Sequence, residues 1–426
     1  MTSAGYLELL RGNRGYRKVW LGSIASNLGD WLNVIAVYTL IDRLTGSPLA
    51  LGLVFVTKML PFALASPVAG LLADRWNRRR LMIGADLVRA LLVLGLLLVR
   101  DAAHLPLLYV VVALQMVVSA AFLPARNASI PNLVSDRELL TANALSSATW
   151  SALLAVGAAL GGLATEALGI YPVFLLDSGS YLISAWFLYR TVIPQHTDSE
   201  PAPLLRTAWR QVAEGWRYMR SHPGVGRVAL AKPAWAFGGG SLVYMLALVG
   251  QRLIPGAPAA GIGWLYAARG LGTGLGPIAT RRWVPRRLWL GLVGLAAVVS
   301  GAAYQGVAWM PWTLWLTVPV LVAHTASGAN WVLSTVMLQE RSEDRFRGRV
   351  FATEWLLLTS TDAVSIVAAS LLLESGALTL RGALALFAAV QLATGALWVA
   401  VVAPRERATG GELVADPAAG PSRRRW

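Results

Sequence analysis

The chain has 426 residues, of which 56% are hydrophobic and only 14% are charged. A soluble globular protein carries about 25% charged residues, so this composition is typical of a membrane protein. The chain has no cysteine, which excludes a disulfide framework and a thiolate metal site. Its formal net charge is +15, and the distribution of this charge decides between nucleic acid and a membrane surface as its partner.

Apolar runs of about 20 residues recur along the chain, and each can cross about 30 Å of hydrocarbon as a helix. Because backbone polar groups in lipid must be satisfied within the segment, we expect an all-α polytopic membrane protein. No cleavable signal peptide is expected, since a basic tail precedes a long first run. The twelve predicted spans cover residues 19–41, 48–72, 81–99, 106–125, 146–168, 170–189, 228–253, 260–280, 288–308, 312–334, 350–374 and 380–403.

Lysine and arginine set the predicted orientation, because basic loops stay on the cytoplasmic side of a membrane. If the amino terminus is inside, inside segments hold 29 of the 37 basic residues and outside segments hold four. We therefore expect a multi-pass protein of the plasma (cytoplasmic) membrane with both termini in the cytoplasm. The same distribution explains the net charge by attraction to an anionic lipid surface, so no nucleic-acid partner is expected.

The chain also contains an internal repeat. DRWNRRR (74–80) follows span two and RRWVPRR (281–287) follows span eight, 207 residues later. IPNLVSDREL (130–139) follows span four and LQERSEDRFRGRV (338–350) follows span ten, 208 residues later. Matching offsets predict two pseudo-symmetric six-helix bundles, an arrangement of secondary transporters. The expected domains are a cytoplasmic tail (1–18), a first bundle (19–190), a cytoplasmic linker with an amphipathic helix (191–227), a second bundle (228–403) and a disordered basic tail (404–426). The amphipathic segment 204–222 is interpreted either as a membrane-surface helix or as a plain connecting helix.

The stretch GLLADRWNRRR (70–80) places charge directly against apolar sequence. Its glycine permits close approach of a helix, and its aspartate can meet a positively polarised helix amino terminus. The pattern resembles the signature loop between helices two and three of the major facilitator superfamily. That resemblance implies an inner gate in which Asp74 contacts the start of span eleven and closes the cytoplasmic side in the outward-facing state. A simple cytoplasmic anchor is the alternative. The residues assigned to this motif are Gly70, Asp74, Arg75, Arg78 and Arg79.

Four further segments resemble the branch of this superfamily that contains the enterobactin exporter and macrolide efflux proteins: SNLGDWL (26–32), FLPARNASIPNLV (122–134), EGWRYMRSHP (214–223) and LQERSEDRFRGRV (338–350). Two features depart from proton antiporters of the family: span four has no early arginine, and the glycine motif of span five is reduced to GAALGG (157–162). Gly157, Gly161 and Gly162 are expected to pack helices closely. The expected cytoplasmic gate partners are Arg126, Lys232, Gly348, Arg349 and Glu354.

Charges inside the spans are the main functional signal, because an ionisable group at mid-bilayer costs several kcal/mol and normally faces the bundle interior. Asp86 and Arg89 are three residues apart on one helix face, which predicts a structural charge pair. Asp177 is interpreted either as a buried group or as a group near the outer surface. The residues assigned to proton and substrate coupling are Asp30, Asp362, His324, Lys58 and Arg269, with Asp30 the first candidate. Lys58 and Arg269 are alternatively partners of Asp30 or binders of an anionic substrate.

These features predict a secondary active transporter, a proton-coupled exporter of a small amphipathic compound such as a drug, macrolide or siderophore. A lipid or lysophospholipid translocator on the same fold is the alternative, and an importer is a further one. An enzyme or ATP-driven pump is not expected, because no phosphate-binding loop, His-Glu-x-x-His pair or nucleophile elbow occurs. No cofactor or metal is expected, and the expected partners are the substrate, protons and membrane lipids, with the chain acting as a monomer.

Overall fold

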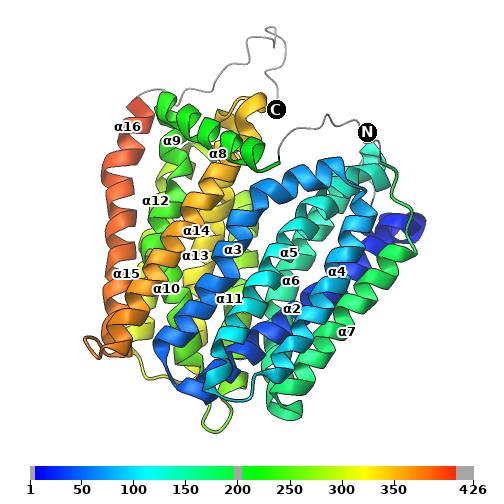
Figure 1. Cartoon of the computed structure of the whole chain (residues 1–426). Helices are drawn as coiled ribbons and strands as arrows, with labels where there is room; N and C mark the ends of the chain where they lie inside the picture. Colours follow the sequence, from blue (N-terminus) through cyan, green and yellow to red (C-terminus); the bar gives the residue numbers. More distant parts are fainter. Residues whose placement is uncertain (1–4, 196–203, 409–426) are drawn as a thin grey trace.

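The computed structural model describes residues 5–195 and 204–408, and every regular element in this part of the chain is helical (Figure 1). The first half contains α2 (Arg14–Thr45), α3 (Pro48–Arg75), α4 (Arg78–Leu94), α5 (Leu105–Leu133), α6 (Asp136–Leu168) and α7 (Ile170–Tyr189). The second half contains α10 (Ala231–Gly250), α11 (Pro258–Trp283), α12 (Trp289–Trp309), α13 (Thr317–Arg341), α14 (Asp344–Glu374) and α15 (Leu380–Leu397).

These twelve helices correspond to the twelve predicted spans, so the predicted fold class is confirmed. Ten helical segments of the described residues are long and apolar enough to cross a membrane. The other two helices, α7 and α11, pack tightly within the same assembly, α7 against α2 and α11 against α6 and α13. Their interiors hold an aspartate and an arginine respectively, in keeping with helices that face protein.

Short helices complete the described chain. They are α1 (Tyr6–Gly12), α8 (Leu204–Ser221), α9 (Pro223–Ala229) and α16 (Ala403–Ala408), with 3₁₀ turns at Gly95–Leu98, Ala102–His104, Arg286–Leu288 and Leu314–Leu316 and a π-helical turn at Trp398–Val402.

Polar caps start several of the long helices. The side chains of Asn13, Ser47 and Asn77 accept hydrogen bonds from backbone N–H groups in the first turns of α2, α3 and α4. Ser135 and Glu138 form a capping box at α6. Because these caps lie beyond the apolar runs, several helices extend past the predicted spans, most clearly at the starts of α2 and α6.

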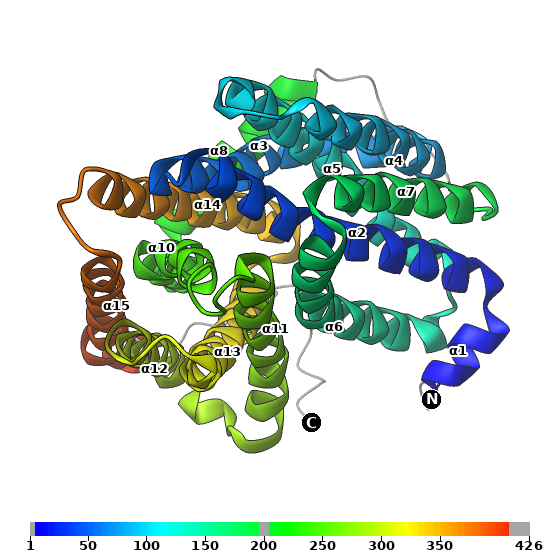
Figure 2. The same cartoon turned by 90° about the horizontal axis from the view of Figure 1, so that it is seen from below.

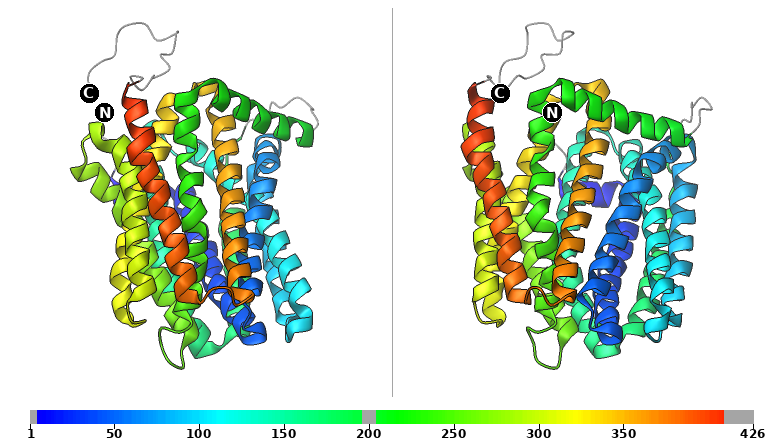
Figure 3. Two further views of the ribbon diagram at one scale, coloured as in Figure 1. Left: turned by 90° about the vertical axis from the view of Figure 1, so that its left-hand side faces the viewer. Right: turned by 60° about the vertical axis from the view of Figure 1, so that its left-hand side comes forward.

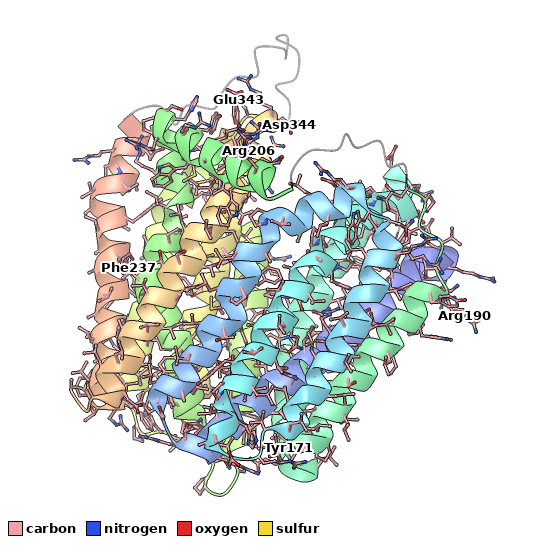
Figure 4. All side chains as sticks on the ribbon, in the orientation of Figure 1. Tyr171, Arg190, Arg206, Phe237, Glu343 and Asp344 are labelled. Carbon is pink, nitrogen blue, oxygen red and sulfur yellow. The ribbon has the colours of Figure 1, made fainter. Side chains whose placement is uncertain are left out.

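Seen from below, the helices of the two halves form two neighbouring groups, which meet mainly where α6 lies beside α11 and α3 lies beside α14 (Figure 2). We call the end that carries α1, α8, α9 and α16 the linker face, and the other end, where α2 joins α3 and α14 joins α15, the distal face (Figure 1). Figure 4 marks the two faces: Glu343 and Asp344 lie at the linker face, and Tyr171 lies at the distal face.

The apolar core differs between the two faces. One large cluster joins the distal parts of both halves and includes Ile35, Val54, Leu246 and Ile366. Toward the linker face the core divides into a cluster of the second half and two clusters of the first half with its adjoining loops. The apolar core is therefore continuous between the halves at the distal face and divided toward the linker face, while α6 and α11 stay in contact as far as Ser151 and Gly274.

The linker helix α8 lies across the linker face over α14 and reaches α3 (Figure 3). The Thr353 hydroxyl of α14 donates a hydrogen bond to the Val212 carbonyl, 3.0 Å away. Arg349 and Glu214 form an ion pair at 2.9 Å. In this structure α8 is thus a connecting helix that is docked on protein.

Both expected tails contain structure. Residues 6–12 of the expected amino-terminal tail form α1, and α2 begins at Arg14 because Asn13 caps it. The expected disordered tail from residue 404 is wrong for residues 404–408, which belong to α16. The physical reason is Glu406, which is buried and pairs with Arg227 and Arg341. Residues 409–426 lie outside the described residues.

Candidate functional site

Charged side chains of both halves lie at a similar depth in the bundle. Lys58, Asp177, Arg269 and Asp362 are each seven to twelve residues from the distal end of their helix. At 1.5 Å per residue this is about 10–18 Å, close to the middle of a hydrocarbon layer of about 30 Å. Charge at this depth needs protein partners or water.

In the first half, Asp30 is held by a chain of polar side chains from three other helices. The Tyr181 hydroxyl of α7 donates a hydrogen bond to the Asp30 carboxylate of α2. The Gln115 amide of α5 donates to the Tyr181 hydroxyl over 2.9 Å. The Arg89 guanidinium of α4 lies 4.4 Å from the centre of the Tyr181 ring. Asp30 therefore points into protein and remains only half-buried.

The structure brings Asp86 and Arg89 of α4 together in a buried ion pair. The same guanidinium lies 4.5 Å from the centre of the Phe122 ring. One face of the arginine thus has aromatic neighbours and its end has an acidic partner, which offsets the cost of burying it.

Lys58 of α3 and Asp177 of α7 belong to the same electrostatic group. Lys58 interacts with the charges of Asp30 and Asp177. Asp177 is fully buried, and among the described residues its carboxylate oxygens have no hydrogen bond of ordinary geometry. The position of Asp177 is thus internal, which decides between the two interpretations of its sequence.

In the second half, Arg269 of α11 is the central charge. It interacts with Asp362 of α14 and with His324 of α13. His324 is buried, and its Nε2 lies 2.9 Å from the Tyr304 hydroxyl of α12. Asp362 is buried beside Gly240 of α10, where an added Cβ would lie 2.5 Å from the carboxylate.

Four aromatic side chains lie between these charges and the distal face. The rings of Tyr38 and Phe55 are stacked with centres 4.6 Å apart. Tyr266 meets the edge of Tyr38 at 6.2 Å, and Tyr244 meets the edge of Phe55 at 5.6 Å. We call Tyr38, Phe55, Tyr244 and Tyr266 the aromatic plug. It joins both halves and lies toward the distal face from Lys58, Arg269 and Asp362, at about the depth of Asp177.

Polar contacts also join the halves at the distal face. The Glu166 carboxylate accepts a hydrogen bond of 2.7 Å from the Ala259 N–H. The Glu374 carboxylate accepts hydrogen bonds from the Ser47 hydroxyl at 2.7 Å and the Leu49 N–H at 3.1 Å. Each glutamate thereby binds the first turn of a helix in the other half.

The loop 70–79 is organised within the first half. Arg78 donates to the carbonyls of Ala73 and Ala128, and Arg79 donates to the carbonyls of Leu188 and Tyr189 at the end of α7. These two arginines satisfy carbonyls of α3, α5 and α7.

Asp74 lies in the last turn of α3, at the linker face. Its side chain is 66% exposed and lies 3.9 Å from Arg78, while Arg75 occupies the last turn of α3. A Cβ at Gly70 or at Gly348 would meet no atom within 4 Å. The expected contact of Asp74 with the start of α14 stays a prediction.

The expected gate partners are divided among different neighbours. Lys232 and Glu354 form a buried ion pair at 2.9 Å, but both belong to the second half. Arg349 pairs with Glu214 of α8, so it contacts the linker instead of the first half. Arg126 bonds to the neighbouring Asn127 and lines a small pocket of about 20 Å³ formed by α2, α5 and α6. This structure therefore does not assemble these residues into one gate.

The three packing glycines lie at two helix crossings. An added Cβ at Gly157 or Gly161 would lie 2.9 Å from Trp31 of α2. At Gly162 it would lie 2.6 Å from the Ala259 carbonyl oxygen, in the other half. Glycine is needed at these positions because the backbones are in direct contact.

Sequence reasoning missed Tyr181, the aromatic plug and the two glutamates Glu166 and Glu374. A tyrosine in an apolar run is unremarkable by itself. The glutamates carry a detectable signal, since they are 208 residues apart, which matches the offset of the internal repeat. Within the described residues, no group of three or more histidine, aspartate or glutamate side chains is placed to hold a metal ion.

Comparisons with known proteins agree with this architecture. Residues 19–353 match the family model of the Major Facilitator Superfamily. The MFS-type transporter YfiS of Bacillus subtilis is 28% identical, and the match covers 80% of this chain and 83% of YfiS. Macrolide efflux protein A of Streptococcus pyogenes is 23% identical, with 83% and 88% covered, and the putative bacilysin exporter BacE of Bacillus subtilis is 24% identical, with 73% and 80% covered.

Solved transporters share the fold. The peptide-family transporter PepTSo superposes with a TM-score of 0.73 at 9% identity, and the match covers 93% of this chain and 99% of PepTSo. A bacterial homologue of the lysosomal transporter Spinster gives 0.66 at 17% identity, with 93% and 97% covered. The match over most of the chain, the two six-helix halves and the buried charges at their centre together show that this chain is a transporter of the Major Facilitator Superfamily.

Proposed function

We propose that the chain is a proton-coupled secondary exporter of a small amphipathic compound, working by alternating access. The observation that carries this proposal is the layer of buried charges shared between two halves whose apolar core is continuous at one face only. Ionisable groups are retained at this depth in membrane proteins where they bind or move a charged species.

The proposed orientation places the linker face in the cytoplasm of a cell bounded by the plasma membrane. Most arginines and lysines outside the spans belong to the loops and helices of this face, and basic loops are retained inside. In that orientation both termini are cytoplasmic, and the described conformation is the inward-facing one, with the aromatic plug closing the outer side.

The proposed substrate class follows from the mixture of aromatic and polar side chains around one pocket. The pocket beside Arg126 combines Trp20 and Trp150 with the polar side chains of Asn27 and Thr149. A pocket of about 20 Å³ does not admit a whole drug molecule in this conformation, but its lining suits one end of a molecule with apolar and polar parts once the site widens. Two relatives are named for export of a macrolide and of bacilysin, which supports a small amphipathic compound and the direction of transport.

The proposed cycle uses the charged layer. Asp30 faces both Tyr181 and the charge of Lys58, so protonation or a cationic substrate group changes its interactions. Asp362 and Arg269 provide an acidic and a basic group on the other half. When the halves rock about this layer, a proton taken up from outside is exchanged for substrate taken up from the cytoplasm.

Reconstituted protein tests the proposal. Proteoliposomes with an imposed pH gradient are expected to accumulate a labelled macrolide, and Asp30→Asn is expected to stop the accumulation. Asp101→Asn is the control, because Asp101 is an exposed carboxylate that caps a short helix within the first half. Undiminished transport by Asp30→Asn would remove Asp30 from the mechanism. Transport of a fluorescent lysophospholipid without macrolide would replace the drug-like substrate by a lipid.

A further inference from the structure

The buried charges of the first half do not balance. Asp177 interacts electrostatically with Asp30, Lys58 and Arg89, and Arg89 is paired with Asp86. Three carboxylates therefore face two cations, and the group carries one excess negative charge when all are ionised. One proton neutralises it.

The geometry selects one of the three carboxylates. Asp30 accepts a hydrogen bond from Tyr181, and Asp86 pairs with Arg89. Asp177 is 0% exposed, and among the described residues its oxygens have no hydrogen bond of ordinary geometry, although the Asn33 amide lies beside them. A buried carboxylate without partners is strongly unfavourable, whereas its protonated form is tolerated.

The site also holds a partner for the proton. Asn33 of α2 is 1% exposed, both polar atoms of its amide are without hydrogen bonds, and it adjoins Asp177. A small adjustment would let a protonated Asp177 donate to the Asn33 amide oxygen while the amide nitrogen donates to the other carboxyl oxygen. Gly29 makes this approach possible, since a Cβ there would lie 2.6 Å from the Asp177 carboxylate.

We infer that Asp177 and Asn33 form the proton-binding site of the transport cycle, separate from the half-exposed Asp30 that faces the substrate. The groups that face Asp177 are Asp30 from α2, Lys58 from α3, Asp86 and Arg89 from α4 and Tyr181 from its own helix. Movement of α3 against α7 changes the distance between Lys58 and Asp177, and approach of the Lys58 ammonium favours release of the proton. This inference rests on the proposed proton-coupled function and assigns its site.

The decisive variant is Asp177→Asn, which retains the shape of the protonated acid and removes its titration. In proteoliposomes it is expected to retain exchange of labelled macrolide across the membrane without a gradient and to lose accumulation driven by a pH gradient. Asp344→Asn is the control, because Asp344 is an exposed carboxylate at the linker face, and it is expected to retain both activities. Gradient-driven accumulation by Asp177→Asn would overturn the inference.

Two further measurements distinguish failure of the proposed function from failure of the inferred proton site. If the wild type shows no macrolide exchange at all, the proposed function fails, and this outcome differs from loss of coupling in the variant. A sodium gradient is not expected to drive uptake. If sodium did drive uptake, and Asp177→Asn abolished it, the site would bind Na⁺ and the inference of a proton-binding site would be overturned.

A measurement on detergent-solubilised protein needs no substrate. Between about pH 5 and about pH 9 the wild type is expected to lose thermal stability as the pH rises, because an unpartnered charge forms at Asp177. Asp177→Asn is expected to flatten this dependence, and an identical slope in both proteins would overturn the inference.

Should Asp177→Asn not fold, Asn33→Ala serves instead. It keeps the carboxyl group and is expected to shift the pH profile of driven uptake; an unmoved profile contradicts the pairing.

Discussion

Glu166 and Glu374 perform the same task in the two halves of the protein. Glu166, near the distal end of α6, accepts a hydrogen bond from the first turn of α11. Glu374, at the distal end of α14, accepts one from the first turn of α3. The two residues are 208 positions apart, the offset of the internal repeat. Each contact joins one half to the other, so together they form a two-fold related closure of the distal face.

Removal of either carboxylate is expected to loosen this closure. Glu166 is partly buried and Glu374 is exposed, and contacts of charges with helix termini are worth about 0.3–1 kcal/mol when exposed and up to about 2 kcal/mol when partly buried. We therefore expect Glu166→Gln to shift the population toward opening at the distal face more than Glu374→Gln does.

Spin labels can measure this shift, and the absence of native cysteine simplifies their attachment. Labels at Ala103 in the first half and Pro255 in the second lie on exposed loops of the distal face. The expected result is a longer-distance population that grows in Glu166→Gln. Asp344→Asn, whose carboxylate pairs with Arg347 at the linker face, should leave the distribution unchanged. Equal distributions for wild type and Glu166→Gln would contradict a closing role.

The fold could be predicted from the sequence because its strongest determinants are patterns within short stretches of the chain. Apolar runs of spanning length and the repeat of basic loops define twelve helices and two halves. Helix ends were less predictable, since caps such as Asn13 and buried partners such as Glu406 fix them through contacts outside the apolar runs. A glutamate in a basic tail does not reveal that two arginines from elsewhere in the chain surround it.

The candidate site was predictable in part for a related reason. Asp30, Lys58, Arg269 and Asp362 are recognisable because charge is expensive within an apolar run. Their partners could not be assigned, because pairing depends on helix rotation. Tyr181 shows the limit, since its hydroxyl contacts Asp30 and Gln115 only because α7 lies between α2 and α5 at this depth.

Backbone contact between α6 and α11 yields a second prediction with an internal control. A Cβ at Gly263 would lie 2.6 Å from the Ala158 carbonyl oxygen, whereas a Cβ at Gly274 in the same helix would lie 3.4 Å from the Ser151 side chain. Gly263→Ala is therefore expected to push the halves apart at the distal face or to lower the melting temperature. Gly274→Ala is expected to resemble the wild type, because its contact is an ordinary one that a side chain can relieve. Equal behaviour of the two variants would show that the helices do not pack as closely as described.

The buried pair of Lys232 and Glu354 yields a third prediction. It tests whether the two charges stabilise each other or are each stabilised by other groups. Its atoms lie 2.9 Å apart, and the Lys232 ammonium also lies 4.7 Å from the centre of the Trp331 ring. Removing one partner leaves an uncompensated buried charge, which costs about 3–5 kcal/mol, whereas replacing both by apolar residues is often neutral.

Lys232→Met and Glu354→Leu are therefore each expected to destabilise the protein strongly, and the double variant is expected to be more stable than either single variant. Melting temperatures in detergent measure the coupling through a double-mutant cycle. Additive losses would show that the two charges are stabilised independently, by water or by Trp331, and not by each other.

Since both residues belong to the second half, the double variant should also retain macrolide exchange. Loss of exchange in a stable double variant would assign the pair to the transport pathway itself.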